Sequence, residues 1–427
     1  MKKFLLLFVS LMLAFTVAAC NGTDDPDDGD LGDVERLVIY QNKVEIDAEL
    51  SAYAEAWGNA NNVIVEVRTC GGDACAYADN LQTEFLRARE PDIFVIEGLG
   101  QYLDFAEKIY DMTGADWIDD TDVPLVAPNG EIVGFPVNFE GWGMAYNRDI
   151  LDAAGIDPDT LTSREGYAAA FATLEDMKDE LGLDTVVSFT TQADMTWVTG
   201  LHNFNGYLSS GLDYNDDSVI TDLLAGVAHR DRLEALADWV ELLNTYTTES
   251  LLISGTYEEQ VNSFKTGRAA FVHQGNWIDP QLIEDGGIDF EVGYAPHASG
   301  LGEVDSIFVA PPPYYVVNVD STPERRDLAV QFLNDMALTE AGHKYMVEDA
   351  NYVPAFNSVE LLPTSPLSAE VTRWAQDGNI YAWWQNDMPT GFGMGEIGPI
   401  YSLFANGTID KEQFIDALEE EIETLAD

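Results

Sequence analysis

The segment between residues 36 and 97 decides the fold, because it holds three short apolar runs: Arg36-Leu-Val-Ile-Tyr-Gln41, Val63-Ile-Val-Glu-Val-Arg68 and Asp92-Ile-Phe-Val-Ile-Glu97. Apolar residues recur at helical spacing between these runs, at Leu50, Tyr53, Ala54 and Trp57 and then at Tyr77, Leu81 and Phe85. The alternation of strand and helix predicts a parallel sheet covered by helices. Ligands of such sheets bind beyond the carboxyl ends of the strands, which here are Gln41-Asn42-Lys43 and Glu97-Gly98-Leu99.

A second set of elements follows. We expect strands at 144–148 and 185–189, and helices at 167–181, 233–243, 328–336 and 411–426. No repeat of fixed period is evident. Two α/β lobes fit this pattern better than one very wide sheet, so the predicted fold class is α/β with two lobes.

The composition limits the function. The chain has 427 residues, 46% of them hydrophobic, which is enough for two domains with substantial cores. It has 20 Lys and Arg against 76 Asp and Glu, for a net charge of −56. Nucleic-acid binding needs clustered basic residues, so that class is excluded, and binding to anionic lipid through a basic face is disfavoured.

The N-terminus has the features of a targeting signal. Lys2 and Lys3 precede an apolar run over residues 4–17, which suits a signal peptide better than a membrane span. Val17-Ala18-Ala19-Cys20 resembles a bacterial lipobox, which implies cleavage after residue 19 and lipid on Cys20. The alternative is an ordinary signal peptide with a chance cysteine. Residues 20–33 are rich in Asp, Gly and Pro, and predict a flexible acidic tether.

Two other cysteines, Cys70 and Cys75, close a Gly-rich loop. Outside the cytoplasm such a pair favours a disulfide over free thiols. The five histidines show no metal-ligand spacing, so we expect no metal and no cofactor. Gly393-Met-Gly-Glu-Ile-Gly398 matches a dinucleotide motif in letters but follows no strand, and Asp213-x-Asn215-x-Asp217 lacks the Gly and Glu of a calcium loop.

Tryptophans in polar surroundings are the clearest hint of a ligand. They are Trp142, Trp197, Trp277, Trp383 and Trp384. An aromatic face beside carboxylates and amides suits a sugar ring, whose C–H face packs on the indole while its hydroxyls form hydrogen bonds. Each tryptophan could equally be a core residue, although at least one of the adjacent pair 383–384 is expected to be exposed.

Five ordered stretches carry a resemblance to a known family. They are 91–97, 134–149 with 154–156, 264–271 with 275–277, 292–296, and 329–354. Together they resemble the extracellular solute-binding proteins of ABC importers, in the family similar to maltodextrin-binding proteins. The resemblance covers about residues 34–427.

The resemblance implies a two-lobed fold of the periplasmic-binding-protein type (type II) with a ligand cleft at the hinge. The chain would leave lobe 1 near residues 137–141, return near 307–313 and cross again after Phe356. Lobe 1 is then expected to comprise residues 34–138 and about 312–358, and lobe 2 residues 139–311 and about 359–427.

The resemblance also implies ligand contacts. The residues at positions where the family contacts sugar are Gln41 to Lys43, Glu140, Gln192 to Trp197, Trp277 and Phe392. One departure concerns the loop after the third strand, where maltodextrin binders carry an Asp-Arg pair and this chain has Glu97-Gly98-Leu99. That departure argues against maltose itself while leaving carbohydrate open.

The sequence thus predicts a lipid-anchored, extracytoplasmic, monomeric binding protein that delivers an oligosaccharide to an ABC permease and performs no chemistry. A polyamine or other cationic solute is the alternative within the same fold, because Glu97 and Glu140 with Trp142 and Trp277 could form an acidic aromatic cage. A secreted glycoside-active enzyme, or a surface adhesin or sensor, are alternatives of other classes.

Overall fold

The computed structural model describes residues 34–71, 75, 77–87 and 90–426. The predicted signal peptide, Cys20 and the tether over residues 20–33 lie outside the described residues. Within the described part, no helix combines the length and the apolar character needed to cross a bilayer.

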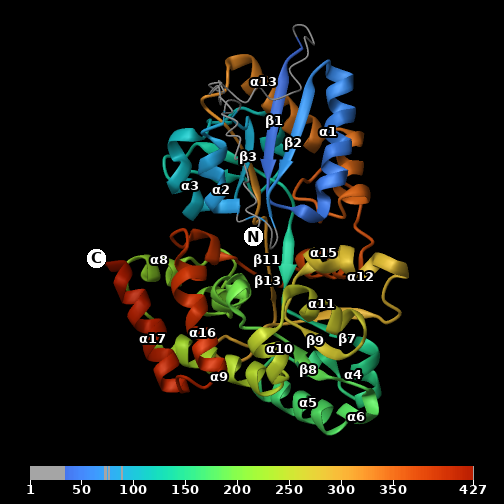
Figure 1. The fold of residues 1–427 in the computed structure, drawn as a ribbon, viewed down its shortest axis with the longest axis vertical. Coiled ribbons are helices and arrows are strands. Elements are labelled where there is room, and N and C mark those ends of the chain that lie inside the picture. The colour runs from blue at the N-terminus through green and yellow to red at the C-terminus, as the bar shows by residue number, and fades with distance from the viewer. Residues whose placement is uncertain (1–33, 72–74, 76, 88–89, 427) are drawn as a thin grey trace, which may run out of the picture.

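The structure consists of two lobes, which Figure 1 shows one above the other. Lobe 1, the upper one, is built on a six-stranded sheet of order β2-β1-β3-β12-β5-β4. Lobe 2 is built on a four-stranded sheet of order β10-β7-β9-β8, and a third sheet of order β13-β11-β6 adjoins it. The predicted α/β architecture with two lobes is confirmed.

The strands of lobe 1 are β1 (Arg36–Gln41), β2 (Ile64–Thr69), β3 (Ile93–Ile96), β4 (Leu125–Val126), β5 (Ile132–Pro136) and β12 (Tyr314–Val317). β1 pairs in parallel with β2 and β3, as the sequence predicts, whereas β12 runs antiparallel between β3 and β5. The core of this lobe includes Leu37, Phe94, Phe135 and Phe332, all fully buried.

The helices of this lobe are α1 (Asp47–Asn61), α2 (Tyr77–Glu84), α3 (Leu99–Phe105), α13 (Pro323–Leu338) and α14 (Glu340–Lys344), of which α1 packs on β2 and α13 on β1 and β12. Cys70 and Cys75, between β2 and α2, are joined by a disulfide.

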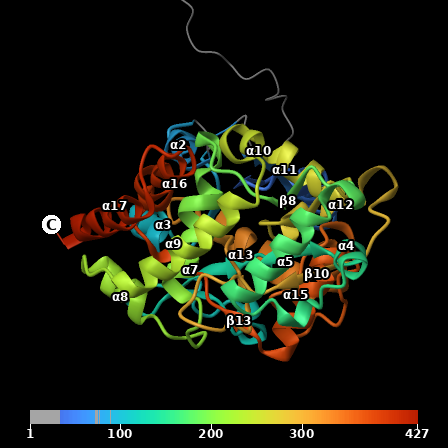
Figure 2. The same ribbon diagram turned by 90° about the horizontal axis from the view of Figure 1, so that it is seen from below.

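Lobe 2 and the third sheet contain β6 (Glu140–Trp142), β7 (Met144–Asn147), β8 (Thr185–Ser188), β9 (Ala269–Val272), β10 (Val292–Ala295), β11 (Ile307–Ala310) and β13 (Ile380–Tyr381). The helices are α4 (Arg148–Ala154), α5 (Arg164–Asp176), α6 (Lys178–Leu181), α7 (Phe204–Ser209), α8 (Ser218–Leu224), α9 (Arg230–Thr245), α10 (Glu249–Ser254), α11 (Tyr257–Lys265), α12 (Asp279–Ile283), α15 (Pro366–Asp377), α16 (Gly398–Ala405) and α17 (Lys411–Glu423). Figure 2 shows α5, α7 and α9 on the lower face, with α16 and α17 to one side and α4 to the other.

The chain crosses between the lobes at β5–β6 and again at β11–β12. The Val137 N–H donates to the Pro313 carbonyl (3.0 Å), which binds the first crossing to the second. The Phe139 N–H donates to the Val353 carbonyl (2.8 Å), which adds a third segment. Glu140 therefore lies at the point where the chain leaves lobe 1.

The lobes touch away from these crossings, where the start of α3 meets residues 386–388. Gly98 has φ +124°, and a Cβ added there would lie 2.7 Å from Asn386 Cβ. A Cβ at Gly100 would lie 2.1 Å from the Met388 carbonyl oxygen. Contacts this close require glycine, so α3 of lobe 1 rests directly on the backbone of lobe 2.

We predict that Gly100→Ala separates the lobes without unfolding either of them. The added methyl group overpacks the contact between the lobes, which costs about 1–3 kcal/mol. Within α3 itself, alanine is a better helix former than glycine. Small-angle X-ray scattering should show a larger radius of gyration than for the parent. Gly395→Ala is the control, because nothing lies within 4 Å of its added Cβ. An unchanged radius in Gly100→Ala would contradict the assignment of this contact.

Candidate functional site

Four polar side chains meet where the strands of lobe 1 end and the chain crosses to lobe 2. Asn42 Nδ2 donates to Glu97 Oε1 at 2.8 Å, which joins the loop after β1 to the loop after β3. Lys43 forms an ion pair with Glu140, the first residue of β6, and lies 3.4 Å from a Glu45 oxygen. The structure thus brings Asn42, Lys43, Glu97 and Glu140 together.

Burial and charge control the protonation of this set. Burial lowers the pKa of the Lys43 ammonium, but Glu140, Glu45 and Glu97 together raise it more, so Lys43 stays charged. Burial raises the pKa of Glu97, with the Glu140 carboxylate adding to the shift, while Lys43 and the Asn42 amide oppose it. Asn42 Oδ1 is buried with no hydrogen-bond partner among the described residues, so it can accept from a ligand hydroxyl.

Aromatic rings of lobe 2 lie near this set, because Asn276, next to Trp277, accepts a hydrogen bond from the N–H of Gly141, next to Glu140. Trp197 lies 5.8 Å from Tyr257 and 6.3 Å from Trp277, measured between ring centroids, and all three rings are half-buried. Burial raises the pKa of the Tyr257 phenol, and the Glu45 carboxylate adds to the shift. Tyr257 therefore links the aromatic rings of lobe 2 to the polar set of lobe 1.

The backbone of lobe 2 explains how these tryptophans are presented. Trp197 begins a π-helix, η7 (Trp197–Asn203), that packs on a second one, η12 (Phe392–Ile397). A Cβ at Gly200 would lie 1.8 Å from the Gly393 carbonyl oxygen, so the two π-helices touch through their backbones. The Trp277 ring folds over Gly275 and donates from Nε1 to Gln274 Oε1 at 2.7 Å.

The His202 ring packs among three of the tryptophan rings. Its ring lies 4.8 Å from Trp277, 5.3 Å from Trp197 and 5.5 Å from Trp383. Burial lowers the pKa of His202 well below its ordinary value, so the imidazole is neutral in neutral solution. The sequence analysis did not identify this residue.

A pocket of about 200 Å³ lies between the lobes beside Glu97. It is lined by Gly98, Val123, Pro124 and Leu125, by Tyr214, Ala310, Pro311 and Tyr314, and by Ala382, Trp383, Trp384, Asn386 and Asp387. Asp387 accepts a hydrogen bond from the Leu99 N–H of lobe 1, yet burial raises its pKa to about 6. Trp383 belongs both to this pocket and to the aromatic group, because its ring lies 6.2 Å from Trp277.

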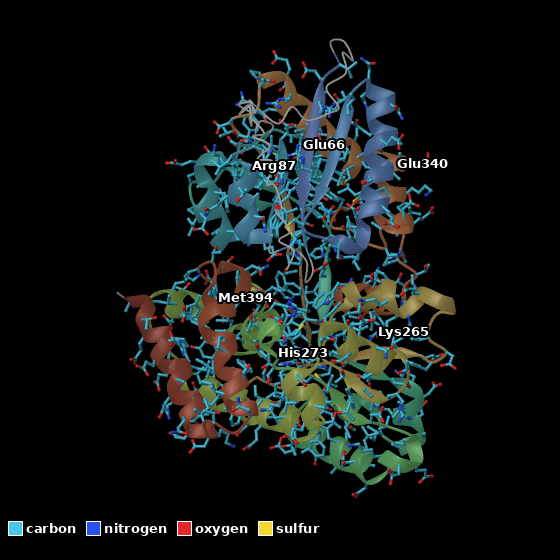
Figure 3. The ribbon with its side chains drawn as sticks, in the orientation of Figure 1. Glu66, Arg87, Lys265, His273, Glu340 and Met394 are labelled. Atoms are coloured by element: carbon cyan, nitrogen blue, oxygen red, sulfur yellow. A yellow bond between two sulfur atoms is a disulfide. The ribbon has the colours of Figure 1, made fainter. Side chains whose placement is uncertain are left out.

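The structure places two other predicted residues in hydrophobic cores. Trp142 is 1% exposed and stacks on Phe308 at 4.2 Å, because the third sheet pairs β6 with β11. Its ring also lies 5.2 Å from His273, which Figure 3 shows in the interior of the lower lobe. Phe392 is 6% exposed in a core with Met388 and Ile397. Both are core residues in this structure, contrary to the sequence-based expectation that they contact the ligand.

The remaining predicted residues have intermediate positions. The Gln192 amide forms two hydrogen bonds with Asp194: its Nε2 donates to the carboxylate, and its Oε1 accepts from the backbone N–H. The second bond caps a short 3-10 helix. Trp383 is 6% exposed but lines the pocket, whereas Trp384 is half-buried and donates from Nε1 to the Asp216 carbonyl at 2.9 Å.

Tyr257, Asp387, Tyr214 and Tyr314 were missed by the sequence analysis. Asp387 follows the Trp383-Trp384 pair closely, which is the only signal that could have indicated it. Among the described residues, no three His, Cys, Asp or Glu side chains are arranged to hold a metal ion. The Gly393–Gly398 motif spans most of η12 and the first residue of α16, and its first and last glycines allow close packing against Gly200 and Thr196.

Comparisons with known proteins identify the family and agree with the two-lobed fold. A family model of bacterial extracellular solute-binding proteins matches residues 52–380. The chain is 22% identical over 381 residues to the melibiose/raffinose/stachyose-binding protein MelE of Bacillus subtilis, covering 84% of this chain and 82% of MelE. It is 24% identical over 309 residues to a maltooligosaccharide ABC transporter solute-binding lipoprotein of Streptococcus pneumoniae, covering 69% and 68%. The structure of a sugar transporter protein of Bacillus licheniformis with stachyose superimposes with a TM-score of 0.70 at 16% identity, covering 91% of this chain and 100% of that one.

We predict that Asp387 makes the folded state less stable as the pH rises from about 4 to above 6. Its folded-state pKa of about 6 exceeds the unfolded value, so the folded protein binds the proton more tightly and loses that advantage on ionisation. The contribution is at most about 3 kcal/mol. Asp387→Asn keeps an acceptor for the Leu99 N–H, so chemical denaturation of both proteins across this range isolates the effect. A stability difference that does not change with pH would contradict the prediction.

Proposed function

The chain belongs to the family of bacterial extracellular solute-binding proteins, and on that premise we propose that it captures an oligosaccharide between its lobes and delivers it to the permease of an ABC importer. The sugars in the names of its relatives support this ligand class. So does the site, which combines hydroxyl-binding groups with aromatic faces.

One observation carries the proposal: the polar set, which lies at the end of the lobe 1 strands and the crossing to lobe 2, is close to half-buried rings of lobe 2. Glu97, Glu140 and Lys43 offer charged hydrogen-bond partners for sugar hydroxyls, while Trp197 and Trp277 offer flat apolar surface for the C–H face. Because the two kinds of contact come from different lobes, a bound sugar stabilises the arrangement in which the lobes touch. Capture of this kind requires no bond to be made or broken, so the role is binding and not catalysis.

The N-terminal segment complements this role. Lipid on Cys20 and the acidic tether over residues 20–33 would keep a monomeric binding domain at the outer face of the membrane, beside its permease. The two lobes would then comprise residues 34–138 with about 312–358, and residues 139–311 with about 359–427.

A cationic solute such as a polyamine is the second candidate. Asp387 lines the pocket, Glu97 precedes the lining residue Gly98, and the one ammonium group of the polar set, Lys43, is already paired with Glu140. Salt separates the candidates, because screening weakens the binding of a cation to carboxylates but hardly affects a neutral sugar.

A thermal-shift screen of the chain from residue 34 tests the proposal. The panel holds raffinose-series sugars, malto-, cello-, xylo-, manno- and chito-oligosaccharides, monosaccharides, polyamines and amino acids. A ligand at 100 times its Kd stabilises the folded state by about 2.7 kcal/mol, and we expect this with one oligosaccharide series at low and high salt. A shift with polyamines alone would replace the sugar by a cation, and formation of sugar products would indicate an enzyme.

We predict that Trp277→Ala and Trp142→Ala have opposite consequences. Trp277 is half-buried at the site, so its loss should weaken oligosaccharide binding at least ten-fold with about 1 kcal/mol lost in stability. Trp142 is a core residue, so its loss should lower the free energy of unfolding by about 3–5 kcal/mol. Calorimetric titration and denaturant unfolding measure the two effects. A collapse of stability in Trp277→Ala would place that ring in the core.

A further inference from the structure

The side chain of Gln41, the last residue of β1, is buried to 1% exposure and makes three hydrogen bonds. Its Oε1 accepts from the Lys43 backbone N–H at 2.5 Å, and its Nε2 donates to the Lys43 carbonyl at 2.9 Å. The same Nε2 donates to Thr69 Oγ1 at 2.6 Å. One amide thus engages both backbone groups of Lys43, as a neighbouring strand would.

Among the described residues no strand pairs with Asn42 or Lys43, because the pairing of β1 with β2 ends at Gln41 and Thr69. Lys43 has an extended backbone, with φ −86° and ψ 98°, and precedes the short 3-10 helix η1 (Val44–Ile46) without capping it through its side chain. Thr69, at the end of β2, accepts from Gln41 and donates from its hydroxyl to Asp47, the first residue of α1. A chain of hydrogen bonds therefore runs from α1 through β2 to the Lys43 backbone.

The segment after β2 encloses the same loop from another direction. The Cys70 N–H donates to the Gln41 carbonyl at 2.9 Å, and Cys70 is held by its disulfide to Cys75. A Cβ at Gly71 would lie 1.9 Å from the Asn42 carbonyl oxygen, so the two backbones touch. Asn42 and Lys43 therefore have little freedom to move away from Glu97 and Glu140.

We propose that Gln41 is a positioning residue of the ligand site: its buried amide fixes the Lys43 backbone so that Asn42 and Lys43 meet Glu97 and Glu140 before a ligand arrives. Gln41 itself touches no ligand, because it is buried. Holding the binding groups in place in advance reduces the ordering that binding would otherwise require. The claim about affinity rests on the proposed function, whereas the claim about the loop does not.

The test compares Gln41→Met with a matched loss of a buried amide elsewhere in lobe 1. Methionine keeps the chain length of glutamine and removes its hydrogen bonds. The control is Asn318→Leu: Asn318 is 1% exposed, donates to the Pro91 carbonyl and accepts from the Asp320 N–H, both at 2.9 Å. Amide hydrogen exchange of Lys43 is measured under native conditions, with Ile39 in the middle of β1 as internal reference.

We expect exchange at Lys43 to accelerate at least ten-fold in Gln41→Met, with Ile39 unchanged and with no effect at Lys43 in Asn318→Leu. The affinity for the oligosaccharide found in the screen should fall at least ten-fold in Gln41→Met alone. Unchanged exchange at Lys43 would overturn the proposal, as would faster exchange with unchanged affinity for a sugar that the parent binds.

The proposal about Gln41 can still be tested if no oligosaccharide binds or if Gln41→Met does not fold. If no oligosaccharide binds the parent protein, the proposed function fails, and the exchange comparison alone decides whether Gln41 holds the loop. If Gln41→Met does not fold, Thr69→Val removes the two hydrogen bonds of the Thr69 hydroxyl, to Gln41 and to Asp47, and leaves both bonds of Gln41 to the Lys43 backbone. It should accelerate exchange at Lys43 several-fold, and unchanged exchange there would overturn the proposal.

Discussion

The ion pair between Lys43 and Glu140 joins the end of the first strand of lobe 1 to the strand on which the chain leaves that lobe. Both side chains are largely removed from water, with exposures of 14% and 9%. Desolvation of two such charges is costly unless further hydrogen bonds and close geometry offset it. Two features hold the pair in place and help to offset that cost. Gln41 fixes the backbone of Lys43, and the crossing strands fix the backbone of Glu140. Because the surroundings are dry, the same charges bind the hydroxyls of a ligand more strongly than they could in water.

Asn276 of lobe 2 fixes the strand that carries Glu140. Its side chain accepts from the Gly141 N–H at 2.9 Å and donates to Ser368 on α15 at 3.1 Å, so the strand that begins with Glu140 is tied to the loop that presents Trp277. Polar groups and stacking rings are therefore fixed to one hinge segment from both sides.

The local sequence pattern predicted the strands of lobe 1 and the loops that follow them, because these depend on residues close together in the chain. The strands expected at 36–41, 63–68 and 92–97 are found at 36–41, 64–69 and 93–96, and the polar residues after them meet because parallel strands end at one edge. Trp142 could not be placed, since the sheet that buries it pairs strands about 165 residues apart (β6 with β11) and about 73 residues apart (β11 with β13) in the chain. Tyr257 and Asp387 were missed for the same reason: they reach the site only through the contact between lobes.

The central claim is that a sugar bridges the lobes at this site. The most direct measurement is the distance between spin labels at Leu103 on α3 and Met394 on η12, both exposed, by pulsed electron paramagnetic resonance. Figure 3 shows Met394 on the side of the lower lobe that faces the upper one. The account predicts a broad distribution without ligand that narrows and shortens on adding a bound oligosaccharide. A distribution that stays the same while calorimetry shows the sugar to be bound would contradict it.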